Sequence, residues 1–118
     1  MSVVSELMHL PGVIAAGEYS YRGDRYSYEG KLDEEMARMA SIMCRATSMG
    51  VHMEGGILGD YCENCGLVPV KGWAVKGPQF AVCVMANVFC FLDAQAGSLN
   101  EAMRTLQRNL ADAPDNLI

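Results

Sequence analysis

The spacing of apolar residues along the chain predicts three helices and five strands. Apolar residues recur at helical spacing in a short segment, Ser5–Leu10, in a long segment that begins at Asp33 and ends near Gly50, and again after Ser98. Strand-like segments bounded by turn residues are Val13–Ser20, Tyr26–Glu29, Val68–Val75, Phe80–Met85 and Val88–Leu92. This order predicts an α/β (α+β) fold with one five-stranded antiparallel sheet, flanked by the long central helix and the C-terminal helix.

The local sequence places these strands within the sheet. Phe80–Met85 and Val88–Leu92 are apolar on both faces, which is typical of central, buried strands. Val68–Val75 contains Pro69 and Gly72, and a proline and a glycine within a strand favour a sheet edge. The intervening segment, residues 51–67, is interrupted by four glycines, and we expect a broken helix or a loop there.

The long helix has two different faces. Met36, Met39 and Met43 form a bulky apolar face, which we expect to lie on the sheet. The opposite face carries small side chains that would let a second copy of the helix approach closely. The residues expected on this second face are Ala37, Ser41, Cys44 and Ser48.

Composition and charge exclude several classes of function. A chain of 118 residues favours a single domain spanning residues 1–118, and 51% hydrophobic residues indicate that some apolar surface serves an interface. The net charge of −5 and the scattered basic residues argue against nucleic-acid binding and against acidic membrane surfaces. The chain has no apolar run long enough to cross a bilayer and no signal-peptide pattern at its N-terminus, so we expect a cytoplasmic protein.

The cysteines provide the one pattern with specific chemistry. Cys62 and Cys65 form a CxxC pair, which can close a disulfide or share a metal ion with two further ligands, for which His52 and Cys44 are the candidates. The acidic residues beside the pair would raise its thiol pKa, and the chain has no second CxxC. A redox- or metal-responsive accessory protein is therefore one alternative, and a pair of inert loop thiols is another.

The chain offers no set of catalytic residues. Its two histidines lack a nucleophilic or acidic companion in the sequence, and the acidic run at residues 33–35 is explained by the start of the long helix. The glycines at residues 55–59 are not followed by the Lys and Ser/Thr of a phosphate-binding loop. We therefore expect neither an enzyme nor a bound cofactor.

Several segments resemble the roadblock (dynein light-chain-like) family, and in particular an uncharacterised prokaryotic branch of it. The resemblance is carried by Leu10–Val13, Ala15–Glu18, Tyr28–Gly30 and Leu32–Glu35, and further on by Gly72-Trp73 and Phe80–Val84. It covers nearly the whole chain and implies a roadblock/profilin-like sheet. Residues 50–65 are longer and richer in glycine than the family pattern.

The resemblance also implies how such a protein works. Roadblock domains form dimers that join their sheets through the third strand and pack their long helices together, and they act as scaffolds or as regulators of small GTPases. For this chain, that implies a homodimeric, non-enzymatic protein-binding module. The implied interface positions are the four small helix residues given above and Val68, Val70, Gly72 and Val75 of the third strand. A sensor domain with a ligand pocket between sheet and helix is a further alternative.

Overall fold

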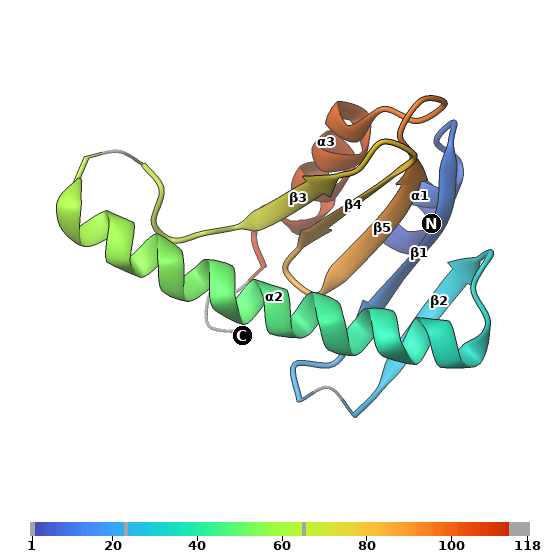
Figure 1. The fold of residues 1–118 in the computed structure, drawn as a ribbon, viewed down its shortest axis with the longest axis horizontal. Helices are drawn as coiled ribbons and strands as arrows, with labels where there is room; N and C mark the ends of the chain where they lie inside the picture. Colours follow the sequence, from blue (N-terminus) through green and yellow to red (C-terminus); the bar gives the residue numbers. More distant parts are fainter. Residues whose placement is uncertain (1, 23, 65, 114–118) are drawn as a thin grey trace.

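The computed structural model describes residues 2–22, 24–64 and 66–113, and it contains one five-stranded sheet with three α-helices (Figure 1). The elements in chain order are α1 (Val3–Met8), β1 (Val13–Tyr19), β2 (Tyr26–Gly30), α2 (Glu34–Tyr61), β3 (Gly72–Lys76), β4 (Phe80–Met85), β5 (Val88–Asp93) and α3 (Leu99–Leu110). The predicted α/β fold with a single antiparallel sheet is confirmed. None of the helices in these described ranges is long and apolar enough to cross a membrane.

The strand order in the sheet is β2-β1-β5-β4-β3, and every neighbouring pair is antiparallel. β4 and β5 occupy interior positions in the sheet, as predicted from their sequences, which are apolar on both faces. β3 is an edge strand, also as predicted, but it begins only at Gly72 because the preceding residues follow α2 instead of the sheet. In the turn between β4 and β5, Ala86 adopts a positive φ of 53°.

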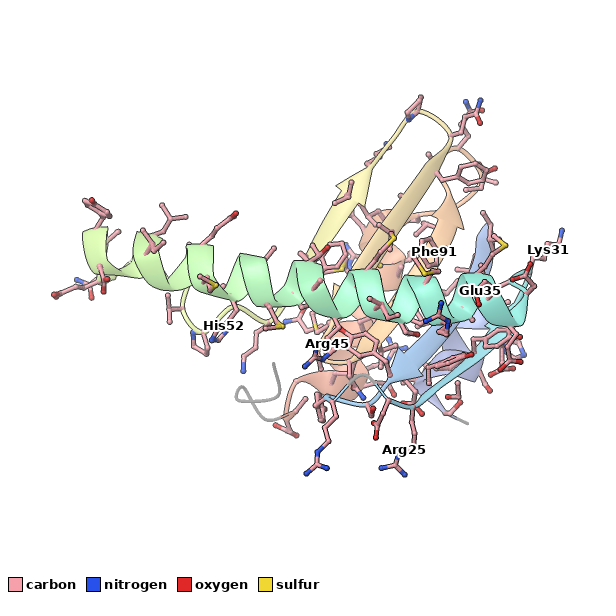
Figure 2. The ribbon with its side chains drawn as sticks, turned by 60° about the horizontal axis from the view of Figure 1, so that its bottom comes forward. Arg25, Lys31, Glu35, Arg45, His52 and Phe91 are labelled. Atoms are coloured by element: carbon pink, nitrogen blue, oxygen red, sulfur yellow. The ribbon has the colours of Figure 1, made fainter. Side chains whose placement is uncertain are left out.

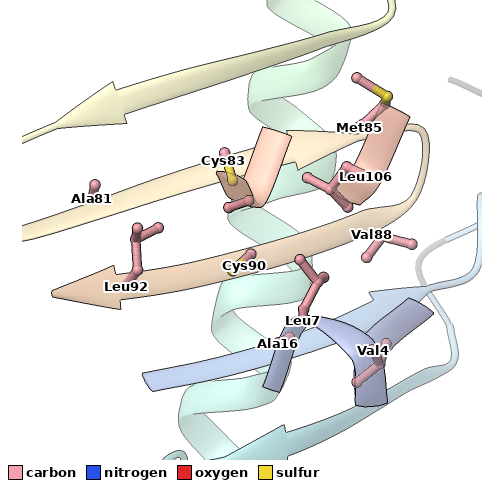
Figure 3. Packing of buried hydrophobic residues seen from close by; sticks show 11 residues of the cluster. Val4, Leu7, Ala16, Ala81, Cys83, Met85, Val88, Cys90, Leu92 and Leu106 are labelled. Carbon is pink, nitrogen blue, oxygen red and sulfur yellow. The ribbon is translucent and has the colours of Figure 1, made fainter. Parts of the chain in front are cut away.

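The two faces of the sheet are covered by different helices (Figure 1). On one face, α1 and α3 pack side by side over β1, β4 and β5, and their side chains Leu7 and Leu106 are fully buried (Figure 3). On the other face, α2 crosses the sheet over Val84 and Phe89. The resulting three-layer arrangement leaves the outer side of α2 uncovered.

The helix α2 is much longer than predicted. It begins after the N-cap Asp33, whose carboxylate accepts a hydrogen bond from the Met36 amide at 2.7 Å, and it continues without a break to Tyr61. The expectation of a broken helix or loop is therefore wrong for residues 51–61. Its 28 residues span about 42 Å, comparable with the molecule's longest dimension of 41 Å.

Two of the glycines that suggested a break have a packing role instead. An added Cβ on Gly55 would lie 2.2 Å from Val70 Cγ2, and one on Gly59 would lie 2.6 Å from Val68 Cγ2. The chain returns from the end of α2 along this glycine surface. The glycines therefore allow the returning segment to pack directly against the helix backbone.

The orientation of α2 is the reverse of the prediction. Met36, Met39 and Met43 are 52%, 44% and 57% exposed, so the bulky face points away from the sheet. The face with small side chains lies on the sheet, because that surface already carries the bulky rings of Phe89 and Phe91, which leave room only for small helix residues.

Candidate interaction surface

The outward side of α2, a helix whose side chains Figure 2 draws as sticks, carries large exposed apolar residues along its length. We call it the outer face, and its large apolar members, each 42–86% exposed, are Met36, Met39, Ile42, Met43, Met49, Met53, Ile57, Leu58 and Tyr61. Most of these residues follow one another at intervals of three or four, which aligns them on the side opposite the buried residues of the same helix. Soluble monomers rarely expose a contiguous apolar surface of this extent, so the outer face has the character of an interface.

The C-terminal half of α2 forms an arm that projects beyond the sheet. We define the arm as residues 49–61, because it follows Ser48, whose hydroxyl oxygen accepts a hydrogen bond from Trp73 Nε1 of β3 at 2.8 Å. Figure 1 shows the arm extending past the β3 edge and the returning segment running back alongside it to β3. The arm therefore lies beside the sheet edge to which a further strand could be added.

The β3 edge carries the second set of predicted interface residues. Val68 and Val75 are 53% and 57% exposed, and Val70 and Gly72 are half-buried. β3 pairs with β4 on one side, so its other side offers backbone hydrogen-bonding groups to a further strand. Gly72 is required by packing within the chain, since an added Cβ would lie 2.5 Å from the Val84 carbonyl oxygen.

The predicted helix positions of the interface do not lie on the surface. Ala37, Ser41, Cys44 and Ser48 are between 0% and 6% exposed and pack against the chain's own sheet. The Ser41 hydroxyl donates a hydrogen bond to the Ala37 carbonyl at 2.8 Å, and Ser48 accepts from Trp73. The chain's own sheet covers these four residues, so they offer no exposed surface for contact with a second copy.

Charged residues flank the outer face near its N-terminal end. Arg38 forms an ion pair with Glu35 at 2.8 Å, which replaces the contact with Glu34 that the spacing also permits, and this bond lowers the pKa of Glu35. Arg45 lies on the sheet side, where its Nε donates to the Tyr21 carbonyl at 2.6 Å. The apolar stripe is thus bordered by polar groups, as in many protein interfaces.

The cysteines separate into two groups. Cys44, Cys83 and Cys90, which we call the core thiols, are free and buried, and burial raises the pKa of Cys44 to about 12. A hydrogen bond between Cys83 and Cys90, together with burial, raises the pKa of Cys90 far above its usual value. Cys44 and Cys90 therefore stay protonated at neutral pH and make poor nucleophiles or metal ligands.

The predicted metal-ligand candidates are not brought together. Cys44 and Cys62 are separated along α2 by about 27 Å, and His52 is exposed on the helix between them. Cys62 follows the last residue of α2 and is disulfide-bonded, whereas Cys65 lies outside the described residues. Among the residues that the structure describes, no group of three His, Cys, Asp or Glu side chains could hold a metal ion.

A pocket of about 360 Å³ lies beside the β1–β2 hairpin, away from the sheet–helix contact where a sensor domain would bind its ligand. It is open to solvent and lined by Glu18, Tyr19, Ser20, Arg25, Tyr26, Ser27 and Asn87. No charged group in it is buried away from water, so it lacks the convergent polar groups of a typical ligand site.

Comparisons with known proteins agree with this fold. A Roadblock/LC7 domain from Streptomyces avermitilis superposes with a TM-score of 0.62 at 20% identity, covering 92% of both chains. A structure described as MglB with tetrameric arrangement superposes with a TM-score of 0.72 at 13% identity, covering 98% of this chain and 84% of that one. The predicted resemblance to the roadblock fold is thereby confirmed.

The sequence itself matches a family of unknown function. No curated protein matches significantly. A family model described as "Uncharacterized conserved protein (DUF2173)" matches residues 3–108, nearly the whole chain. The chain therefore belongs to the uncharacterised conserved family DUF2173, whose member here has the roadblock fold.

Proposed function

We propose that this protein is a homodimeric, non-enzymatic scaffold or regulatory module that pairs through the outer face of α2 and the β3 edge. The observation that supports the proposal is the large exposed apolar surface of α2, which is not part of the chain's own core. The roadblock fold supports it as well, since the resemblance implies pairing of sheets through the third strand and packing of the long helices.

The energetics favour coverage of this surface. Fully burying a side chain of this size contributes about 1.5–3 kcal/mol, so each half-exposed member of the outer face still has about 1 kcal/mol to gain. Nine such residues on each copy represent on the order of 10–20 kcal/mol of gross stabilisation in a symmetric dimer, if every one is covered. That exceeds the low end of the association cost, about 4–15 kcal/mol. Pairing of the exposed β3 edge with a second copy adds backbone hydrogen bonds and removes a site of unwanted strand pairing.

The dimer can be tested by its mass. Size-exclusion chromatography with light scattering is expected to give twice the chain mass of 12.8 kDa, or about 26 kDa, at micromolar concentration. A mass of 12.8 kDa at high concentration would contradict the proposal. Val75→Lys, at the exposed β3 edge, should weaken the dimer without unfolding the subunit, since Val75 is 57% exposed.

The partner that we propose is a protein, with a small GTPase as the specific candidate from the roadblock resemblance. Methionine-rich surfaces adapt to different partners because the side chain is unbranched and flexible. A purified prokaryotic small GTPase, loaded with GDP or with a non-hydrolysable GTP analogue, is the direct probe, and binding is measured by calorimetry. Nucleotide-dependent binding would support a regulator of GTPases, whereas no binding in either state would favour a scaffold for other proteins.

A second candidate is a redox-responsive accessory protein that uses Cys62 and Cys65. The observation that favours it is the disulfide bond of Cys62, which lies directly after the arm and is exposed. Thiol titration before and after dithiothreitol treatment tests it, with the oligomeric mass measured in both states. Two additional thiols together with a changed mass or partner affinity would support this function. An unchanged mass and affinity would mean that the disulfide only stabilises the local structure.

A further inference from the structure

We propose that the hairpin side of α2 binds an amphipathic helix of a partner protein, in which acidic residues border the apolar face. This inference rests on the proposed protein-binding function and names the chemistry of the partner. It is carried by a line of basic residues on α2 and by the apolar residues that run beside that line.

Three basic residues recur every seven positions along one side of α2. They are Arg38, Arg45 and His52, and each is about 10.5 Å from the next along the helix axis. We call this line the basic border. Figure 2 shows Arg45 and His52 on the same side of the helix. That side faces the connection between β1 and β2, because Arg45 Nε donates to the Tyr21 carbonyl there.

The basic border offers hydrogen-bond donors to a partner. Arg38 and His52 are exposed, and Arg45 is half-buried. The Nη groups of Arg45 make no hydrogen bond within the described residues, so its guanidinium can still bind a carboxylate. Arg22, which is exposed and directly follows Tyr21, adds a further positive charge beside the centre of the border.

Little negative charge lies beside the basic border. Between Glu35, which pairs with Arg38, and Asp60, the single acidic residue of α2 is Glu54. Glu54 follows His52 by two positions, which places it on the other side of the helix. The chain as a whole has nine Lys and Arg against 14 Asp and Glu. A basic line on an otherwise acidic molecule favours a partner with acidic residues at the contact.

Apolar residues run parallel to the basic border. Ile42 and Met49 are 43% and 42% exposed, and each follows an arginine of the border by four positions, which makes them its neighbours on the helix surface. The next position in this series is Gly56, where nothing lies within 4 Å of an added Cβ. The glycine leaves room for another backbone to approach. A repeat of seven residues suits a second helix that lies lengthwise at a shallow crossing angle.

A second copy of α2 does not suit this side of the helix. In an antiparallel two-fold pair the same side of each helix faces its counterpart, so two basic borders would oppose each other and repel. The proposed dimer can use the other side of the outer face, which carries Met36. Met36 precedes Arg45 by nine residues, or two and a half turns, and therefore points away from the basic border.

Two synthetic peptides test the charge preference. Both are amphipathic helices of about 20 residues, or between five and six turns, with leucines at intervals of three and four residues. One peptide has glutamates beside the leucines, and the other has lysines at the same positions. Fluorescence anisotropy should show that the acidic peptide binds at least about 10-fold more tightly at low salt, and that high salt reduces this difference.

Variants of the protein locate the contact. Arg38→Glu and His52→Glu change exposed residues, and each should weaken binding of the acidic peptide by about 3- to 10-fold. Arg104→Glu is the matched control, because it makes the same charge change at an exposed residue of α3, on the opposite face of the sheet. The control should keep the wild-type affinity.

The outcomes separate this inference from the proposed dimer. Preference for the acidic peptide that is weakened by both border variants, but not by Arg104→Glu, supports the inference. Equal binding of the two peptides, no binding of either, or an equal loss in Arg104→Glu overturns it. Displacement of the acidic peptide by duplex DNA would assign the border to nucleic acid and also overturn it.

Light scattering on the same samples gives the second readout. A dimer that shows no preference for the acidic peptide overturns this inference alone, whereas a monomer that prefers the acidic peptide overturns the proposed dimer alone. Loss of the dimer in His52→Glu would place the basic border in the contact between copies and overturn the inference.

Discussion

The substitution Met53→Glu tests whether the outer face of α2 is an interface. Met53 is the most exposed methionine of that face, at 68%, and its side chain is not part of the core. Glutamate and methionine have similar helix propensities, so the subunit should keep its fold. In the dimer, by contrast, the substitution places a carboxylate within an apolar contact.

The magnitude follows from the exposed fraction. Burying the remaining two thirds of a methionine contributes about 1–2 kcal/mol, and that contribution is lost. Burying a polar group without a partner costs about 1–3 kcal/mol more. Symmetry applies both terms twice, which gives a total of about 4–10 kcal/mol. Even the lower value raises the dissociation constant about 1,000-fold.

Sedimentation equilibrium over a range of concentrations measures this change, and far-UV circular dichroism verifies the fold. His52→Glu is the matched control, because it adds the same side chain at the adjacent exposed residue, off the outer face. The control should keep the wild-type dissociation constant within a few-fold. If Met53→Glu dimerises as tightly as the control, the outer face is not the interface and the reasoning is refuted.

Three further predictions concern the subunit itself. Ser48→Ala removes the acceptor of the Trp73 indole and should lower the free energy of unfolding by about 1 kcal/mol in urea titrations, whereas Thr47→Ala should have little effect. The core thiols should resist a thiol reagent in the native protein and react fully in guanidinium; fast native reaction of all three would contradict their burial. The hydrogen bond from Arg108, followed by that from Asn109, lowers the pKa of Glu6. The stabilisation of the protein by ionised Glu6 is therefore complete above the unfolded-state pKa and is lost as the pH falls through the folded-state pKa. Glu6→Gln should consequently destabilise the protein at pH 7 but not at pH 2.

The sheet could be predicted from the sequence because its signals are local. β4 and β5 are apolar on both faces and are bounded by turn residues, so their positions agree with the prediction to within one residue. α3 likewise begins directly after Ser98, as predicted, and the Ser98 hydroxyl accepts a hydrogen bond from the Glu101 amide. A pattern of this kind depends on neighbouring residues alone.

The candidate surface could not be predicted in full because it depends on contacts between distant residues. Both sides of α2 are apolar, and only the bulk of Phe89 on the sheet decides that the small residues face inward. The glycines of the arm indicate a break unless Val68 and Val70 are known to pack on them. The remaining signal in the sequence was the 3.6-residue recurrence of large apolar residues from Met36 to Tyr61, which spans the supposed break.

Methionine oxidation of the native protein by hydrogen peroxide, followed by proteolytic digestion and mass spectrometry of the peptides, tests the central claim most directly. The claim is that the outer face of α2 is covered in solution. At micromolar concentration, Met43 should oxidise several-fold more slowly in the wild type than in Met53→Glu, while Met8 on α1 should oxidise at the same rate in both. Equal rates for Met43 in the two proteins would show that the outer face is exposed to solvent and would contradict the account.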